Sequence, residues 1–216
     1  MINIKFLMTA SLLVFSSLPA SATIVINALP GAVQPAENVA FHNNVPSGNS
    51  ATGHTNQTTT QVNFTGIEPL VTPSQGQARI EAGDGGLSQL AFELNGGLGF
   101  REVEFNIFGT GGTATQTVLN FTDQFGTVFS DTFAITNGEN FFSALALDNQ
   151  FITRVQFLLN GDVQDARQFR IGGIGIVPDP DTSTVPEPES WALFIVGFGL
   201  VGATMRRRSR MVSVTA

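Results

Sequence analysis

Two glutamates that lie two residues apart in the segment REVEFNIFG, residues 101–109, are the first candidates for chemistry. Glu102 and Glu104 fall on one face of an extended strand, because alternate residues of a strand share a face. Two carboxylates across a sugar cleft are what glycoside hydrolysis requires. However, the E-x-D-x-x-E pattern of such enzymes is missing, and the two positions equally fit the solvated face of an amphipathic strand. We therefore predict no enzyme, with a carbohydrate-active enzyme using Glu102 or Glu104 as the alternative.

The two histidines, His42 and His54, lie in a polar segment rich in Gly, Asn and Ser that we interpret as a loop. No G-x-S-x-G sequence is present to place a nucleophilic serine beside either of them. The chain has no cysteine and no H-E-x-x-H sequence, so zinc ligation is not indicated. We predict no catalytic residue, no cofactor-binding residue and no metal ligand.

Oxygen-bearing side chains gather near the ends of the last two predicted strands. They are Asp148, Asn149, Asn160, Asp162 and Asp165. Such side chains can ligate Ca²⁺, although the spacing matches no EF-hand loop. Asx turns explain the same residues, and Arg167 or Arg170 is expected to pair with Asp165 or Asp162. A Ca²⁺-dependent binding module therefore remains a second alternative.

Charge is unevenly distributed along the chain. Lys5 is the only lysine, and residues 23–185 contain 5 Arg against 15 Asp or Glu, a net charge of 5 − 15 = −10. Phosphate binding needs clustered basic residues. We therefore exclude nucleic acid as a partner.

The elements that would position these side chains are strands. Short alternating segments recur from residue 61 onward, with turn residues every eight to twelve positions. In residues 101–109 the side chains of Val103, Phe105 and Ile107 are expected to face a core. Residues 30–60 lack such alternation and are expected to form a long loop. We predict an all-β body, residues 23–177, folded as an antiparallel β-sandwich of eight to ten strands, jelly-roll-like in topology.

The N-terminal segment, residues 1–22, has the features of a signal peptide. Lys5 supplies the positive charge, residues 6–18 form an apolar stretch, and Pro19 precedes the small residues Ala20, Ser21 and Ala22. We predict a signal helix that signal peptidase removes by cleavage after Ala22. The protein is therefore expected to be exported.

The C-terminal region combines a linker, a proline-flanked acid, an apolar run and a basic cluster. Residues 178–184 form the linker, residues 185–210 the signal and residues 211–216 a tail. Trp191 to Met205 is an uncharged run of fifteen residues, about 22 Å long as a helix against a hydrocarbon core of about 30 Å. Arg206, Arg207 and Arg208 follow at once. We predict a short transmembrane helix whose arginines stay on the cytoplasmic side of the inner membrane.

This arrangement resembles the PEP-CTERM sorting signal. Pro186, Glu187 and Pro188, then two residues, then Trp191 and Ala192, match its PEPxxWA variant. The resemblance implies that Pro186, Glu187 and Pro188 are the recognition residues and that Trp191 and Ala192 are specific to the variant. It also implies processing by exosortase, a membrane protease of Gram-negative-type bacteria.

The resemblance implies a surface or extracellular-matrix protein that is tethered only transiently to the inner membrane. Passenger domains of this family look like carbohydrate-binding jelly rolls, so exopolysaccharide is a candidate partner. The body contains no Trp and no Tyr for stacking on sugars. We therefore expect a structural or adhesive role with weak glycan binding.

Overall fold

The computed structural model describes residues 23–41, 48–73, 76–178 and 188–211. One compact unit is Ala22–Thr182, called the body below, and the other includes Ser183–Ala216. All helix in the described residues lies outside the body. The strands of the body are β1 Ile24–Asn27, β2 Glu37–Phe41, β3 Ser50–Thr55, β4 Gln61–Gly66, β5 Leu70–Val71, β6 Gly76–Gln77, β7 Arg79–Ala82, β8 Leu87–Leu94, β9 Leu98–Gly99, β10 Glu102–Phe108, β11 Gln116–Asp123, β12 Val128–Ala134, β13 Glu139–Ala146, β14 Ile152–Val163, β15 Asp165–Gly172 and β16 Gly175–Ile176.

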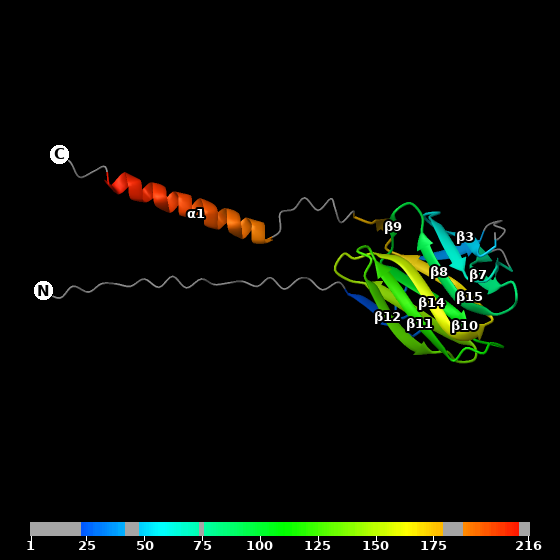
Figure 1. Ribbon diagram of the computed structural model, residues 1–216. Coiled ribbons are helices and arrows are strands. Elements are labelled where there is room, and N and C mark those ends of the chain that lie inside the picture. The colour runs from blue at the N-terminus through cyan, green and yellow to red at the C-terminus, as the bar shows by residue number, and fades with distance from the viewer. Residues whose placement is uncertain (1–22, 42–47, 74–75, 179–187, 212–216) are drawn as a thin grey trace. The chain divides into compact units, whose positions relative to one another are not determined.

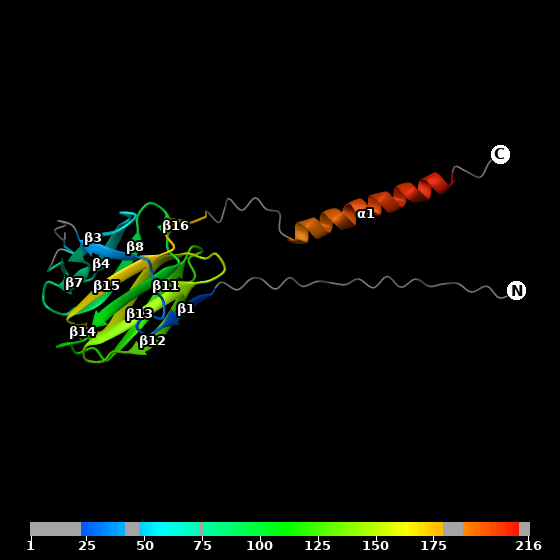
Figure 2. The same ribbon diagram turned by 180° about the vertical axis from the view of Figure 1, so that it is seen from behind.

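Fourteen of these strands form one long antiparallel sheet that curls on itself, and β9 pairs with β16 in a separate two-stranded sheet (Figures 1 and 2). The order of the long sheet is β1-β13-β10-β15-β2-β3-β4-β8-β14-β11-β12, and the short strands β5, β6 and β7 join beside β2 and β15. The ring centroids of Phe133 on β12 and Phe142 on β13 lie 5.5 Å apart, and β13 is the neighbour of β1. The two ends of the sheet therefore approach each other. The sheet is therefore nearly closed and barrel-like.

Phenylalanine rings fill the interior of this sheet. The ring centroid of Phe92 on β8 lies within 5.7 Å of three other ring centroids. These belong to Phe64, Phe105 and Phe169, which come from three other strands. All four side chains are at most 1% exposed. Burying one such side chain stabilises the fold by roughly 1.5–3 kcal/mol, so these rings hold opposite parts of the sheet together.

The strand predicted most clearly from the sequence, β10, is confirmed. Val103, Phe105 and Ile107 are each 0% exposed and face the core. The prediction of a long loop over residues 30–60 is wrong, because β2 and β3 lie within it. In β2 the buried Val39 and Phe41 alternate correctly, but the segment is too short to stand out in sequence.

The predicted fold class is confirmed at its coarser level: the body is all β and antiparallel. β2 pairs with β15 on one side and β3 on the other, so it joins the two halves of the sheet into one path. The finer prediction of a two-sheet sandwich with jelly-roll topology is not confirmed by this continuous path. The described residues of the body contain sixteen strands, more than the predicted eight to ten, because seven of them have five residues or fewer.

The C-terminal helix, α1, runs from Pro188 to Met211. Its apolar side chains from Leu193 to Val201 are more than half exposed. By mean hydropathy, none of the helices in the described ranges is long and apolar enough to cross a membrane. The helix is thus present, whereas its predicted crossing of the membrane is not supported by this finding.

Candidate functional site

The side of β13, β10 and β15 that faces away from the phenylalanine core is called the outer face here. The register places Glu104 between Ser143 of β13 and Arg170 of β15. Two residues further along β10, Asn106 lies opposite Arg167. A row of polar side chains therefore crosses three strands that are far apart in sequence.

Much of this row is buried, which the sequence did not predict. Glu104 is 5% exposed, and Asn106 and Ser143 are both 0% exposed. Glu104 Oε2 accepts a hydrogen bond of 2.8 Å from the backbone N–H of Gly31, in the segment between β1 and β2. Glu104 Oε1 also lies 3.6 Å from Arg170 Nη1. The expected solvated face is wrong at Glu104, which this connecting segment contacts, and at Asn106, which bonds Gln168 and the backbone N–H of Asn140.

The second part of the outer face is an ionic network around Asp165, which is 0% exposed. Arg79 Nε lies 3.1 Å from Asp165 Oδ2, and Arg167 also donates to this carboxylate. Arg167 stacks on Phe108, its guanidinium carbon lying 3.8 Å from the ring centroid. Arg79 additionally pairs with Glu81. The predicted pairing of Arg167 with Asp165 is confirmed, and it fixes both guanidinium groups.

A bulge interrupts β15 within this network. The pairing with β10 shifts register between Glu104 and Asn106, and opposite the shift Gln168 has a φ of 56°. Such a left-handed conformation costs a residue other than glycine roughly 1–3 kcal/mol. Gln168 Oε1 accepts a hydrogen bond of 3.0 Å from Asn106 Nδ2. The buried amide thus holds the strained residue in place.

A pocket of about 200 Å³ opens beside the bulge, and it is called the bulge pocket here. Its lining residues are Gln77, Ala78, Arg79, Arg167 and Gln168. Two arginines and two glutamines are therefore among the residues that line one small cavity. Such groups bind carboxylates and hydroxyls by hydrogen bonds.

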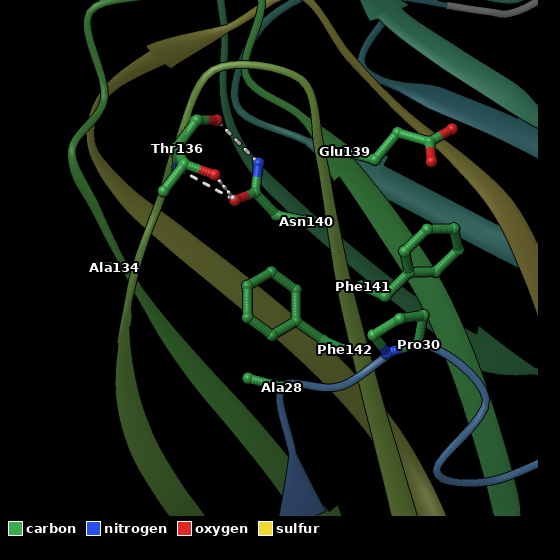
Figure 3. Close-up of a pocket in the computed structure, with 8 residues that line it drawn as sticks. All are labelled: Ala28, Pro30, Ala134, Thr136, Glu139, Asn140, Phe141 and Phe142. Carbon is green, nitrogen blue, oxygen red and sulfur yellow. Dashed lines mark hydrogen bonds between the residues drawn. The ribbon is translucent and has the colours of Figure 1, made fainter.

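A larger pocket of about 420 Å³ lies where the nearly closed sheet leaves a seam between β12 and the end of β1 (Figure 3). Pro30 and Phe141 form an apolar wall, and Glu139 is exposed beside them. Thr136 and Asn140 are bonded to each other, since Asn140 Oδ1 accepts from Thr136 N and Oγ1 at 2.9 Å. In this pocket, called the seam pocket here, the polar side chains of Thr136 and Asn140 therefore already use hydrogen bonds to each other.

The structure separates most residues that the sequence singled out. Glu102 is half-buried and Glu104 is buried, so the two carboxylates are not equally open to solvent. His54 lies on β3 and not in a loop, beside a pocket of about 390 Å³ lined also by Thr55, Asn56 and Thr59. His42 falls outside the described residues.

The oxygen-rich side chains near the ends of the last strands take part in hydrogen bonds and turns. Among the described residues, no group of three or more His, Cys, Asp or Glu could hold a metal ion. Asp162 instead accepts hydrogen bonds from the backbone N–H and the hydroxyl of Thr113, and these bonds lower its pKa. Asp148 and Asn149 both have positive φ angles, 52° and 61°, as in a tight turn.

Sequence reasoning missed Gln168 and Asn106 as parts of a site. One signal was present in the sequence, because the buried apolar side chains of β15 are Ala166, Phe169 and Ile171. A regular strand repeats every two residues, so the three-residue step from Ala166 to Phe169 indicates a bulge. The burial of Asn106 had no such signal.

The sorting residues lie partly within α1. Pro188 begins the helix, and Trp191, Ala192, Arg206, Arg207 and Arg208 follow in it. Pro186 and Glu187, like Ala20 and Ala22 of the predicted signal-peptide cleavage site, lie outside the described residues. The roles and domain boundaries given to these segments remain predictions from the sequence.

Residues 184–208 match the model of the PEP-CTERM protein-sorting motif, so the chain contains a sorting motif of this kind. The motif supports export, processing by exosortase, and a surface or extracellular location. No curated protein matches the chain. Among solved structures, the enzymatically active domain of bacteriophage CBA120 tailspike protein 4 is similar at 12% identity with a TM-score of 0.26. That match covers 70% of this chain and 19% of the tailspike chain.

Proposed function

We propose that this is a surface or extracellular-matrix protein of a Gram-negative-type bacterium whose body has a structural or adhesive role with weak glycan binding. The match of residues 184–208 to the sorting motif is the observation on which the proposal depends. The proposed route begins with removal of residues 1–22 by signal peptidase. The C-terminal segment then holds the chain at the inner membrane until exosortase cleaves it.

The finer assignment is the PEPxxWA variant of the motif. Pro186, Glu187 and Pro188 are the proposed recognition residues, with Trp191 and Ala192 specific to the variant. The two prolines support this role, because each removes a backbone donor and favours extended geometry in the residue before it. An extended segment fits a protease cleft.

For the body, a role without catalysis is favoured by the state of its carboxylates. Glu104 is buried against Gly31 and Arg170, and Asp165 is committed to two arginines. Neither is available as an open general acid or base. The competing proposal, a carbohydrate-active enzyme, predicts that Glu102→Gln with Glu104→Gln abolishes hydrolysis of a glycan library.

The test of the sorting proposal is the intact mass of the exported protein from two hosts, one with and one without exosortase. We expect a product that begins at Thr23 and ends near Glu187 only in the host with the enzyme. A product that retains Arg206 to Ala216 in both hosts would contradict exosortase processing. A product that retains residues 1–22 would contradict the signal peptide.

A further inference from the structure

We propose that the bulge pocket binds the carboxylate of an acidic sugar, such as a uronate unit of a polysaccharide. This inference rests on the proposed function, because it names the class of glycan that the body would contact. The pocket is lined by Arg79 and Arg167 from two neighbouring strands and by Gln77 and Gln168.

The arginines are arranged as fixed donors. Arg79 and Arg167 lie directly opposite each other in the pairing of β7 with β15. The carboxylate of Asp165 accepts hydrogen bonds from Nε of both arginines and from Nη2 of Arg167. Nη2 of Arg79 forms an ion pair with Glu81. In the described part of the chain, the hydrogen bonds and ion pairs of Arg79 and Arg167 involve Nε and Nη2, so Nη1 of each arginine can donate to a ligand. Two guanidinium donors without acceptor capacity suit a carboxylate better than a neutral hydroxyl.

The two glutamines suit the rest of a sugar ring. Gln77 is exposed, and a side-chain amide both donates and accepts, as hydroxyl groups do. A cavity of about 200 Å³ is below the usual size range for drug-sized ligands and limits the bound unit to about one sugar ring. The pocket therefore fits a single charged sugar rather than a long neutral chain.

The side chains of the pocket are also preorganised for binding. The buried Asp165 fixes both arginines, Phe108 supports Arg167 from below its guanidinium plane, and Asn106 bonds the strained Gln168. Groups fixed in this way lose little entropy when a ligand binds. Strained backbone conformations cluster at functional sites. Gln168, which has a positive φ angle, is one of the residues that line the pocket.

The negative charge of the body does not prevent such binding. The stretch 23–185 has a net charge of −10, but at physiological salt the Debye length is about 8 Å, so distant carboxylates are screened. Within the network itself, Arg79 and Arg167 balance Glu81 and Asp165. An added carboxylate therefore meets a locally neutral site whose nearest donors are guanidinium groups.

The test is isothermal titration calorimetry of the full chain with trigalacturonate and, as the neutral control, with galactotriose. We expect trigalacturonate to bind at least about tenfold more tightly, since hydrogen bonds to charged groups are the stronger ones. Arg79→Gln and Arg167→Lys should each weaken binding about tenfold. Arg154→Gln, on the far strand β14 and paired with Glu93, is the matched control and should bind unchanged.

Gln77→Ala removes an exposed amide and guards against variants that fail to fold. It should keep the wild-type melting temperature and weaken binding about threefold. The proposal is overturned if galactotriose binds as tightly, if the arginine variants bind as wild type does, or if an acidic oligoglutamate peptide binds better than trigalacturonate. None of these outcomes changes the processed mass, so sorting and sugar binding are judged separately.

Discussion

The C-terminal sorting segment and the outer face of the body differ in how their functional residues are distributed along the chain. The sorting segment matches its family model over the single stretch 184–208. The bulge pocket takes Arg79 from β7 and Arg167 from β15, and Asp165, which joins them, is 86 residues from Arg79. One region can be recognised as a linear sequence, whereas the other exists only after the sheet has formed.

The difference has a consequence for mutation. A protease that reads an extended segment needs only local residues, so changes there alter processing and leave the stability of the body unchanged. The bulge pocket shares Asp165 and Asn106 with the fold, so most changes there alter stability and binding together.

The largest effect is expected in the sorting segment. Glu187→Ala should abolish processing by exosortase, because it removes the only charge of the recognition triplet. The free energy of unfolding of the body should change by less than about 0.5 kcal/mol, as for a surface substitution. Intact mass and urea unfolding measure the two quantities. Glu189→Ala, two residues further on, is the control and should be processed normally. A stable body with normal processing in Glu187→Ala would contradict the assigned role.

In the core, Phe169→Ala should cost about 3–5 kcal/mol, because it removes a fully buried ring that contacts Phe64, Phe92 and Phe105. Urea unfolding gives this difference in free energy. Phe125→Ala is the matched control, since Phe125 is 61% exposed and should change stability by about 0.5 kcal/mol or less. A similar loss in both variants would show that the rings around Phe92 do not form the core.

On the outer face, Asp165→Asn should lower the free energy of unfolding by about 3 kcal/mol. This is near the lower end of the range for breaking a buried ion pair, because both arginines keep some contact with water. Glu93→Gln breaks the exposed pair with Arg154 and should cost less than about 1 kcal/mol. The same urea titrations measure both. Equal costs would mean that Asp165 does not organise the network.

The sequence indicated the inward residues of β10 correctly because their alternation is local. Val103, Phe105 and Ile107 recur every second residue, and no other segment is needed to see them. The burial of Glu104 could not be predicted in this way. It depends on Gly31, which lies 73 residues away and donates to the carboxylate only once the segment before β2 crosses the sheet.

β2 and β3 were missed for a related reason. β3 reads SATGHT, in which Gly53 lies where a side chain would meet Val39 at 2.9 Å and the backbone of Ala40 at 3.3 Å. A strand with so few apolar residues gives no hydrophobic alternation. It is held by its pairing with β2 and β4, which is tertiary information.

The smallest expected effect is a pH dependence at Glu37, a buried carboxylate on β2. Burial by itself raises the pKa of Glu37, but hydrogen bonds from the backbone of Thr58, from the hydroxyls of Thr55 and Thr58 and from the backbone of Gln57 outweigh it. The pKa is therefore held below its ordinary value of 4.5. These bonds tie the turn after β3 to β2.

Because its pKa is lower in the folded state, Glu37 stabilises the body above pH 4.5, and this contribution is lost as the pH falls through the folded pKa. Glu37→Gln should therefore be less stable than wild type at pH 7, and the difference should shrink below pH 4.5. Urea unfolding at a series of pH values measures it. Glu139→Gln, at an exposed position in the seam pocket, is the control and should show no such trend. A difference that stays constant down to pH 3 would mean that Glu37 acts by shape and not by charge, and the turn would then depend on its backbone bonds alone.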